Sequence, residues 1–307
     1  MGKILVIRGG ALGDFLLTLP AISLLRKALP DAQVDVLGYQ QFIQVAQAAG
    51  LVDGARSIEY GKLAPFFAKQ VDLAPELREY FGSFDVVISY LFDPDALFTT
   101  NLARCEVETI LRGKHKPAEG EGHAALQLAK PLEALAVYTE DRPRLKLGIA
   151  PDQVAPGPGG TLALAPGSGS LAKNWPAERW IDLGHRALDE GKADQLLLLT
   201  GEVESASGLR DMVLSGLDGL PLLHLDHAPL TVVAEALISC SAYVGNDSGL
   251  SHLAGGLGIP TTAIFGPTDP DVWSPVGDQV AVVQAPDGGD LAEVELKDVA
   301  DSIPAPN

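Results

Sequence analysis

The sequence predicts an α/β protein made of two doubly wound domains. Short apolar runs, with the length of buried parallel strands, alternate with amphipathic stretches that predict helices. The alternation stops at a Pro- and Gly-rich stretch, residues 149–160, and then restarts. Glycine-rich turns follow three predicted strands, around Gly13, Gly167 and Gly249. Together these observations predict two Rossmann-like halves, residues 1–155 and 156–307.

The first half is expected to contain four strands and five helical regions. The predicted strands are residues 4–7, 34–37, 57–59 and 85–89. The predicted helices are residues 15–29, 41–49, 60–82 (broken by Pro65 and Pro75), 97–103 and 123–138 (interrupted by Pro131).

The second half repeats the pattern. Its predicted strands are residues 161–165, 195–200, 222–225, 243–244 and 261–265, and its predicted helices are residues 177–189, about 203–214, 230–238 and 250–257. The tail from about residue 281 is less regular. Two courses stay open for this tail: it stays with the second domain or returns to the first.

Composition limits the classes of function. A formal net charge of −18 argues against a nucleic-acid binder, which needs a basic surface. Cys105 and Cys240 lie far apart and are expected to be buried thiols in a reducing compartment. The sequence opens without a signal-peptide pattern, and no apolar run is long enough to span a membrane. We therefore expect a cytoplasmic protein, with peripheral binding to the inner face of the membrane as an open alternative.

The turn before the helix at 250–257 predicts an anion site. Asn246, Asp247, Ser248 and Gly249 stand between a strand and an apolar-periodic run that starts at Leu250. A helix that starts there leaves several backbone N–H groups unpaired and aimed at one point, which suits a phosphate. The alternative is an ordinary capped turn.

The first glycine-rich turn matches neither common phosphate motif. Gly10 and Gly13 fit a dinucleotide fingerprint, but Arg8 stands where its first glycine belongs. A P-loop needs Lys after the last glycine, and Asp14 stands there instead. Asp14 is therefore either an N-cap or a general base that faces a cleft.

The second glycine-rich turn, after the strand at 161–165, combines donors with one cation. Ser168, Gly169 and Ser170 supply hydroxyl and backbone donors, and Lys173 supplies a point charge. This combination suits a diphosphate held without a metal. A solvated surface position is the alternative for Lys173.

Carboxylates and a histidine follow two further strands. Glu202 and Glu204 either accept hydrogen bonds from ribose hydroxyls or favour a helix start through its dipole. His252 lies one helical turn beyond Asp247 and is placed to reach the same anion.

Two Asp-Pro-Asp triplets, residues 93–95 and 269–271, allow either a shared cation or a helix opening with Asp as the N-cap. We favour the cap for both. His224 and His227 lack the further Cys or His ligands of a zinc site, so no metal site is predicted.

Four segments in this order, residues 7–21, 166–180, 245–254 and 265–270, resemble the inverting glycosyltransferases of family nine. These enzymes are the lipopolysaccharide heptosyltransferases, and the resemblance covers nearly the whole chain. It implies the GT-B fold, in which two Rossmann-like domains face a central cleft. The first domain would bind the acceptor and the second the nucleotide-sugar donor.

The resemblance also implies roles for individual residues. Asp14, after Gly13, matches the base that deprotonates the acceptor hydroxyl, and Lys173 matches a residue that holds the donor diphosphate. The further matches to donor-binding positions are Ser168 with Gly169, either Glu202 or Glu204 at the ribose, and Asp247, Ser248, Gly249, Leu250 and His252.

The implied donor is ADP-heptose, and the implied acceptor is lipopolysaccharide or another glycan or lipid-linked molecule, with no metal or other cofactor and no nucleic acid. Two features depart from the family pattern. Gly169 stands where many relatives carry a second hydroxyl residue. The acceptors of the family are anionic, whereas this chain is strongly acidic. Its candidate basic contacts are Arg56, Lys62, Lys69, Arg104, Arg112, Lys114 and Lys116.

The leading hypothesis is an inverting, metal-independent glycosyltransferase. A nucleotide-sugar epimerase of the same architecture is the first alternative, and product analysis without an acceptor separates the two. A non-catalytic nucleotide-sugar binder is the second. An NAD-dependent oxidoreductase is a distant third, because Arg8 interrupts the fingerprint.

Overall fold

A computed structural model of the chain describes residues 2–69, 71–139, 141–149 and 160–304. The chain divides into two compact units, unit 1 (Met1–Pro143) and unit 2 (Arg144–Asn307). The boundary expected at residue 155 lies outside the described residues.

Unit 1 is built on a parallel sheet of five strands in the order β3-β2-β1-β4-β5. The strands are β1 (Lys3–Ile7), β2 (Gln33–Gly38), β3 (Gly54–Ser57), β4 (Val86–Ser89) and β5 (Thr109–Arg112). The helices are α1 (Leu12–Ala28), α2 (Gln40–Ala48), η1 (Gly61–Phe67), α3 (Pro75–Gly82), α4 (Leu97–Ala103), α5 (Ala124–Ala129) and η2 (Lys130–Leu135). One core cluster packs Phe66, Phe81 and Phe98 against the buried face of β1 and β4.

Unit 2 is built on a parallel sheet of six strands in the order β11-β10-β9-β6-β7-β8. The strands are β6 (Thr161–Ala165), β7 (Gln195–Thr200), β8 (Leu222–Asp226), β9 (Ala242–Asn246), β10 (Thr261–Phe265) and β11 (Val280–Gln284). The helices are η3 (Leu171–Lys173), α6 (Ala177–Asp189), α7 (Glu202–Ser207), α8 (Leu209–Gly216), α9 (Leu230–Ile238), α10 (Gly249–Leu257), α11 (Pro270–Trp273), η4 (Pro286–Gly288), η5 (Leu291–Glu293) and α12 (Leu296–Ser302).

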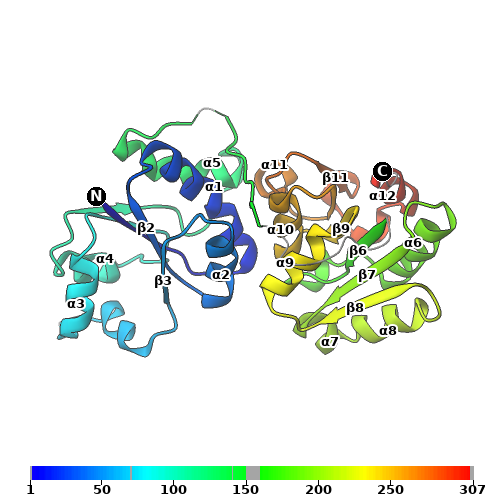
Figure 1. The fold of residues 1–307 in the computed structure, drawn as a ribbon, viewed down its shortest axis with the longest axis horizontal. Coiled ribbons are helices and arrows are strands. Elements are labelled where there is room, and N and C mark those ends of the chain that lie inside the picture. The colour runs from blue at the N-terminus through cyan, green and yellow to red at the C-terminus, as the bar shows by residue number, and fades with distance from the viewer. Residues whose placement is uncertain (1, 70, 140, 150–159, 305–307) are drawn as a thin grey trace. The chain divides into compact units, whose positions relative to one another are not determined.

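Numbered within unit 2, the strand order is 3-2-1-4-5-6, which is the Rossmann order; unit 1 has its first five strands in the same sequence. Helices α6 and α12 lie on one side of the second sheet and α9 and α10 on the other (Figure 1). The strands β6, β9 and β10 are buried along their whole length, as expected for strands covered on both faces.

The tail forms regular structure within unit 2. Strand β11 pairs with β10, and α12 contributes Val299 and Ala300 to the core cluster that also holds Trp175 and Trp180 of the α6 region. The described part of the tail thus belongs to unit 2. Among the described residues, no helix combines the length and the hydropathy that crossing a membrane requires.

Candidate functional site

Each sheet has a topological switch point, where the connections that follow two neighbouring strands run to opposite sides of the sheet. Ligands of open α/β sheets bind there, outside the carboxyl ends of the strands. In unit 2 this switch point lies between β6 and β9. The turn with Ser168 and Lys173 follows β6, and the turn with Asp247 and Ser248 follows β9. Two of the three predicted turns therefore meet at the switch point of unit 2.

An ion pair joins the two turns. Lys173 Nζ lies 2.6 Å from Asp247 Oδ2, and the Thr268 hydroxyl donates to the same oxygen at 2.7 Å. The Lys173 side chain is 29% exposed and the Asp247 side chain 7%. Lys173 is thus neither a freely solvated surface lysine nor a buried one, since its ammonium group is anchored while part of the side chain stays accessible.

Helix α10 presents the start that the sequence predicts. Ser248 is its N-cap residue, with extended backbone, and its side chain makes no capping hydrogen bond. The first N–H groups of an α-helix have no acceptor within the helix, so those of Gly249 and Leu250 point outward from the start of α10. His252 is buried in the first turn of this helix.

The turn after β6 is held by its own hydroxyl. Ser168 is buried, and its Oγ lies 2.7 Å from the Ser170 carbonyl oxygen and 2.8 Å from Asn174 Oδ1. The Ser168 hydroxyl is thus committed to shaping the turn. The backbone at Gly169 is exposed and free of side-chain bulk, so no Cβ stands between it and a ligand.

The structure separates the two candidate glutamates. Glu204 is partly buried, and its Oε2 accepts a hydrogen bond from the Gly201 N–H at 2.8 Å. Its other oxygen lies so close to Gly167 that a Cβ at this glycine would overlap it. Glu204 therefore touches the turn after β6, whereas the Glu202 side chain is exposed at the first position of α7.

A buried asparagine, Asn246, joins the two turns by hydrogen bonds. The sequence predicts it only as part of the polar turn. Asn246 is fully buried; its Nδ2 donates to the Pro166 carbonyl at 2.7 Å, and its Oδ1 accepts from the Trp175 N–H at 3.2 Å. A buried amide with both ends bonded fixes the spacing of the segments that it joins. Asn246 thus sets the separation of Lys173 and Asp247.

In unit 1 the switch point lies between β1 and β4, and Asp14 follows β1. The structure places Asp14 at the third position of α1, which begins at Leu12 and not near Phe15, and Gly13 stands just before it. Asp14 is therefore not the N-cap residue, which is Ala11, although its Oδ2 accepts from the Ala11 N–H at 3.0 Å.

A buried arginine holds the carboxylate of Asp14. Arg8 is 2% exposed, and its Nη2 lies 3.2 Å from Asp14 Oδ1 while its Nε donates to the Asp14 carbonyl. Burial lowers the pKa of the Arg8 guanidinium, and the Asp14 charge opposes that effect. In the sequence Arg8 only excludes the dinucleotide fingerprint, and its pairing with Asp14 becomes visible in the structure.

The predicted N-cap is confirmed for the triplet at 269–271 and is wrong for the triplet at 93–95. The Asp269 side chain accepts from the Asp271 N–H at the start of α11, as predicted. Asp93 is not the N-cap residue of α4, but its carboxylate accepts from the N–H groups of Phe98 and Thr99 in the first turn. Asp93 is the first residue of a short turn, residues 93–96, that precedes α4.

The remaining titratable candidates have structural partners. His224 Nε2 lies 2.7 Å from the Thr200 hydroxyl, and His227 Nδ1 lies 3.0 Å from Asp226. Within the described ranges, no three His, Cys, Asp or Glu side chains gather closely enough to hold a metal ion.

Several candidate basic residues of unit 1 are paired. The Arg56 guanidinium lies 3.8 Å from the centroid of the Tyr80 ring, Lys62 pairs with Glu76, and Arg112 donates to the Asp93 carbonyl. Lys69 and Arg104 line a hollow of about 490 Å³ beside α4.

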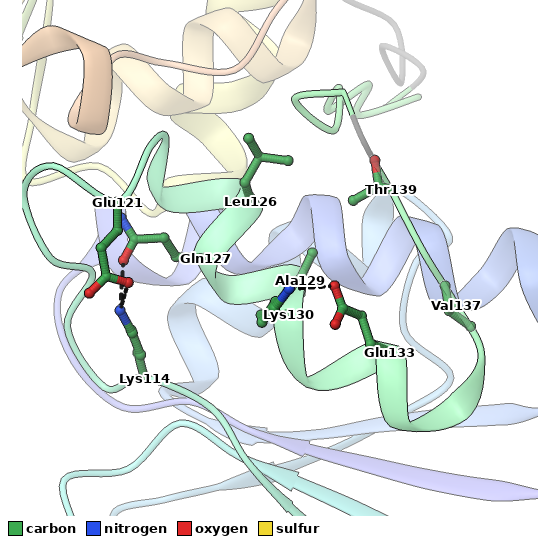
Figure 2. A pocket seen from close by; sticks show the side chains of 9 residues that line it. All are labelled: Lys114, Glu121, Leu126, Gln127, Ala129, Lys130, Glu133, Val137 and Thr139. Carbon is green, nitrogen blue, oxygen red and sulfur yellow. Dashed lines mark hydrogen bonds and ion pairs between the residues drawn. The ribbon is translucent and has the colours of Figure 1, made fainter.

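A pocket of about 340 Å³ lies between the loop after β5 and the α5–η2 segment (Figure 2). Its charged side chains pair as Lys114 with Glu121 and Lys130 with Glu133. Gln127 bonds to Lys114 and to the Ala118 backbone, and thereby holds the loop against α5. The pairing leaves this pocket without a net charge from its lining residues.

Comparisons with known proteins agree with this architecture. Lipopolysaccharide heptosyltransferase 1 of Pseudomonas aeruginosa is 25% identical over 300 residues, which cover 87% of this chain and 79% of that protein. Lipopolysaccharide heptosyltransferase 2 of Escherichia coli is 29% identical over 148 residues, 43% of this chain. Matches to the type 2 proteins are partial and span 40% of the E. coli protein and 34% of the Haemophilus influenzae protein.

Solved structures show the fold. E. coli heptosyltransferase WaaC with ADP superposes with a TM-score of 0.75 at 21% identity, over 97% of this chain and 98% of that one. A family 9 glycosyltransferase from Veillonella parvula gives a TM-score of 0.76 at 18% identity, over 98% and 96%. The predicted GT-B fold is thereby confirmed. The model for glycosyltransferase family 9 (heptosyltransferase) matches residues 126–303, more than half of the sequence, and the chain therefore belongs to that family.

Proposed function

We propose that this protein is an inverting glycosyltransferase that transfers heptose from ADP-heptose to a lipopolysaccharide-type acceptor. The family and the names of the relatives support the sugar and the acceptor class, and one solved relative, E. coli heptosyltransferase WaaC, has structures with ADP and with ADP-2-deoxy-2-fluoro heptose. The observation that carries the proposal is the Lys173 ammonium, anchored 2.6 Å from Asp247 beside the start of α10.

In this proposal the switch point of unit 2 holds the donor diphosphate. As the bond between the sugar and the diphosphate breaks, its electron pair moves to the phosphate oxygen, which gains negative charge. A helix start stabilises an anion by at most about 2 kcal/mol. A charge-assisted hydrogen bond from Lys173 adds about 1.5–3 kcal/mol, and both interactions strengthen as the charge develops, which is the condition for catalysis.

The geometry refines the role of Asp247. A carboxylate aimed at a diphosphate would repel it, but Asp247 Oδ2 already receives Lys173 and Thr268. We assign Asp247 to positioning Lys173, with the donor contacts made by Lys173, the Gly169 backbone and the N–H groups of Gly249 and Leu250. Glu204, which touches the turn after β6, is the candidate for the ribose hydroxyls in preference to Glu202.

Asp14 is the proposed base. It takes the proton of the acceptor hydroxyl while that oxygen attacks the anomeric carbon on the face opposite the leaving diphosphate, and the configuration inverts. Arg8 occupies Oδ1 and the Ala11 N–H occupies Oδ2. Each carboxylate oxygen accepts more than one hydrogen bond, so the hydroxyl can still be received while Arg8 fixes the carboxylate.

No metal is assigned a role, since Lys173 and the start of α10 supply the positive charge in this proposal. We place the reaction in the cytoplasm, with contact to the inner membrane surface only through a lipid-linked acceptor.

The test is transfer of heptose from ADP-heptose to de-acylated lipopolysaccharide, followed by mass spectrometry. Asp14→Asn should lower kcat by roughly 10²–10⁴-fold and leave the Kd for ADP unchanged. A chelator should leave the rate unchanged. Conversion of ADP-heptose without acceptor would favour the epimerase, and equal rates for wild type and Asp14→Asn would remove the assigned base.

A further inference from the structure

An exposed aromatic pair lies at the switch point of unit 1. Phe92 follows β4 and His115 follows β5, and their ring centroids are 4.7 Å apart with planes tilted by 58°. The Phe92 side chain is 66% exposed although most phenylalanines of this chain are buried. Asp14 follows β1, the strand beside β4. The pair therefore stands at the edge of the sheet where an open α/β fold binds ligands.

The loop that carries Phe92 is firmly held. The next residue, Asp93, bonds through its carboxylate to the N–H groups of Phe98 and Thr99 at 3.0 and 2.9 Å. The Asp93 carbonyl also accepts from Arg112 Nη2 at 2.6 Å. Phe92 thus projects into solvent from a fixed backbone, and its exposure is not the consequence of a loose loop.

The backbone at His115 is fixed by contacts that lead to Asp14. Gly113 passes so close to the buried Tyr90 ring that any Cβ there would overlap it. Two residues on, the His115 carbonyl accepts from Arg8 Nη1 at 2.8 Å. The Nη2 of the same guanidinium pairs with Asp14 Oδ1 at 3.2 Å. One buried guanidinium therefore ties the aromatic pair to the carboxylate.

We propose that Phe92, backed by His115, is a stacking platform for the acceptor sugar whose hydroxyl is deprotonated by Asp14. This inference rests on the proposed function. The face of an aromatic ring is electron-rich and attracts the polarised C–H groups on the apolar face of a pyranose. A sugar on Phe92 would have its ring fixed on one side and its hydroxyls free at the edge, where a base next to the platform can reach one of them.

The platform explains how a strongly acidic protein can hold such an acceptor. Lys62 is paired with Glu76, and the guanidinium groups of Arg56 and Arg112 are held by the Tyr80 ring and the Asp93 carbonyl, so stacking would add a contact that does not draw on these side chains. Stacking needs no charge on the protein and discriminates by the shape of the sugar face. Phe92 is thus assigned to orienting the acceptor, and Asp14 to the chemistry.

The experiment compares Phe92→Ala and Phe92→Trp with Tyr138→Ala as a matched control, since Tyr138 is 68% exposed in the same unit. The acceptor probes are two de-acylated lipopolysaccharides, one free of heptose and one ending in a single heptose. For whichever of the two probes accepts heptose, we expect Phe92→Ala to raise the acceptor KM roughly tenfold and to leave the Kd for ADP unchanged. Phe92→Trp should retain the wild-type KM. Tyr138→Ala should have no effect.

A second readout does not depend on turnover: saturation-transfer NMR of the same probes without donor. Loss of the signal in Phe92→Ala, but not in Tyr138→Ala, supports the platform even if wild type transfers no heptose, and in that case the proposed function alone fails. An unchanged acceptor KM and signal in Phe92→Ala overturns the platform while transfer stands. A parallel loss of ADP affinity would also overturn it, because the nucleobase of the donor, and not the acceptor sugar, would then stack on the Phe92 ring.

Discussion

The pair of Lys173 and Asp247 allows a test that separates ligand binding from charge balance. Lys173→Ala removes the cation and leaves the Asp247 carboxylate, which is 7% exposed, with Thr268 as its remaining partner. Two effects then act together: the diphosphate loses a contact, and an unneutralised carboxylate faces it.

The size of the first effect follows from the kind of bond. A charge-assisted hydrogen bond contributes about 1.5–3 kcal/mol, and each 1.4 kcal/mol is tenfold in affinity, so ADP should bind roughly 10- to 150-fold more weakly. The unpaired carboxylate should also lower the free energy of unfolding by about 1–3 kcal/mol, towards the lower end because Lys173 is itself 29% exposed.

The double variant Lys173→Ala/Asp247→Asn distinguishes the two effects. If Lys173 contacts the diphosphate, removing the Asp247 charge restores stability and the share of ADP affinity lost to repulsion, but not the share that the contact itself supplies. Calorimetric titration with ADP, with and without magnesium, and urea unfolding measure the two quantities. Lys297→Ala is the control, since Lys297 is exposed and pairs with Asp301 one helical turn away. Wild-type ADP affinity in the double variant would refute the contact and leave Lys173 as a counter-ion of Asp247.

Two further predictions concern the rest of unit 2. Glu204→Gln should weaken ADP binding several-fold while Glu202→Gln leaves it unchanged, because Glu204 alone touches Gly167; equal titration curves for both variants would contradict this. Cys240 is partly buried, and not fully buried as the sequence predicts. Burial raises the pKa of its thiol to about 12, so the contribution of the thiol to the free energy of unfolding is complete below its unfolded value of 9.0 and is lost as the pH rises towards 12. Iodoacetamide should therefore leave Cys240 unmodified at pH 8.5 until urea unfolds the chain, and rapid labelling of the folded protein would disprove it.

The strands that the sequence predicts well are the central ones. The runs at 161–165 and 261–265 match β6 and β10 to the residue, because a strand covered on both faces needs a continuous apolar run. The central strand β9 is longer than the predicted 243–244, and the larger errors are at sheet edges. Strands β5 and β11 were not predicted, and β3 begins at Gly54, three residues before the predicted start. All three are edge strands and half-exposed, and only β11 carries a continuous apolar run, residues 280–283. The place of an edge strand depends on neighbours that sequence periodicity does not contain.

For the site, the sequence supplied the residues but not their pairing. The turn after β6 and the turn after β9 were each interpreted as donors to a phosphate, which treats Lys173 and Asp247 as independent. Their ion pair depends on β6 and β9 being neighbours, although nearly eighty residues of chain separate them. The bond of Arg8 to the His115 carbonyl was missed for the same reason, because His115 follows β5 and lies more than a hundred residues along the chain from Arg8.

The two switch points have the same topology, but the anchored side chain is a cation in unit 2 and a carboxylate in unit 1. In unit 2 a cation is anchored by a carboxylate beside a helix start, and in our proposal its ammonium group and the helix N–H groups face the leaving diphosphate. In unit 1 a carboxylate is anchored by a buried cation in the first turn of a helix. In our proposal Asp14 is the base, and the ion pair with Arg8 fixes the direction of its carboxylate. The same guanidinium fixes the backbone of His115, and in our proposal the direction of the base and the position of the acceptor sugar are therefore set by one side chain.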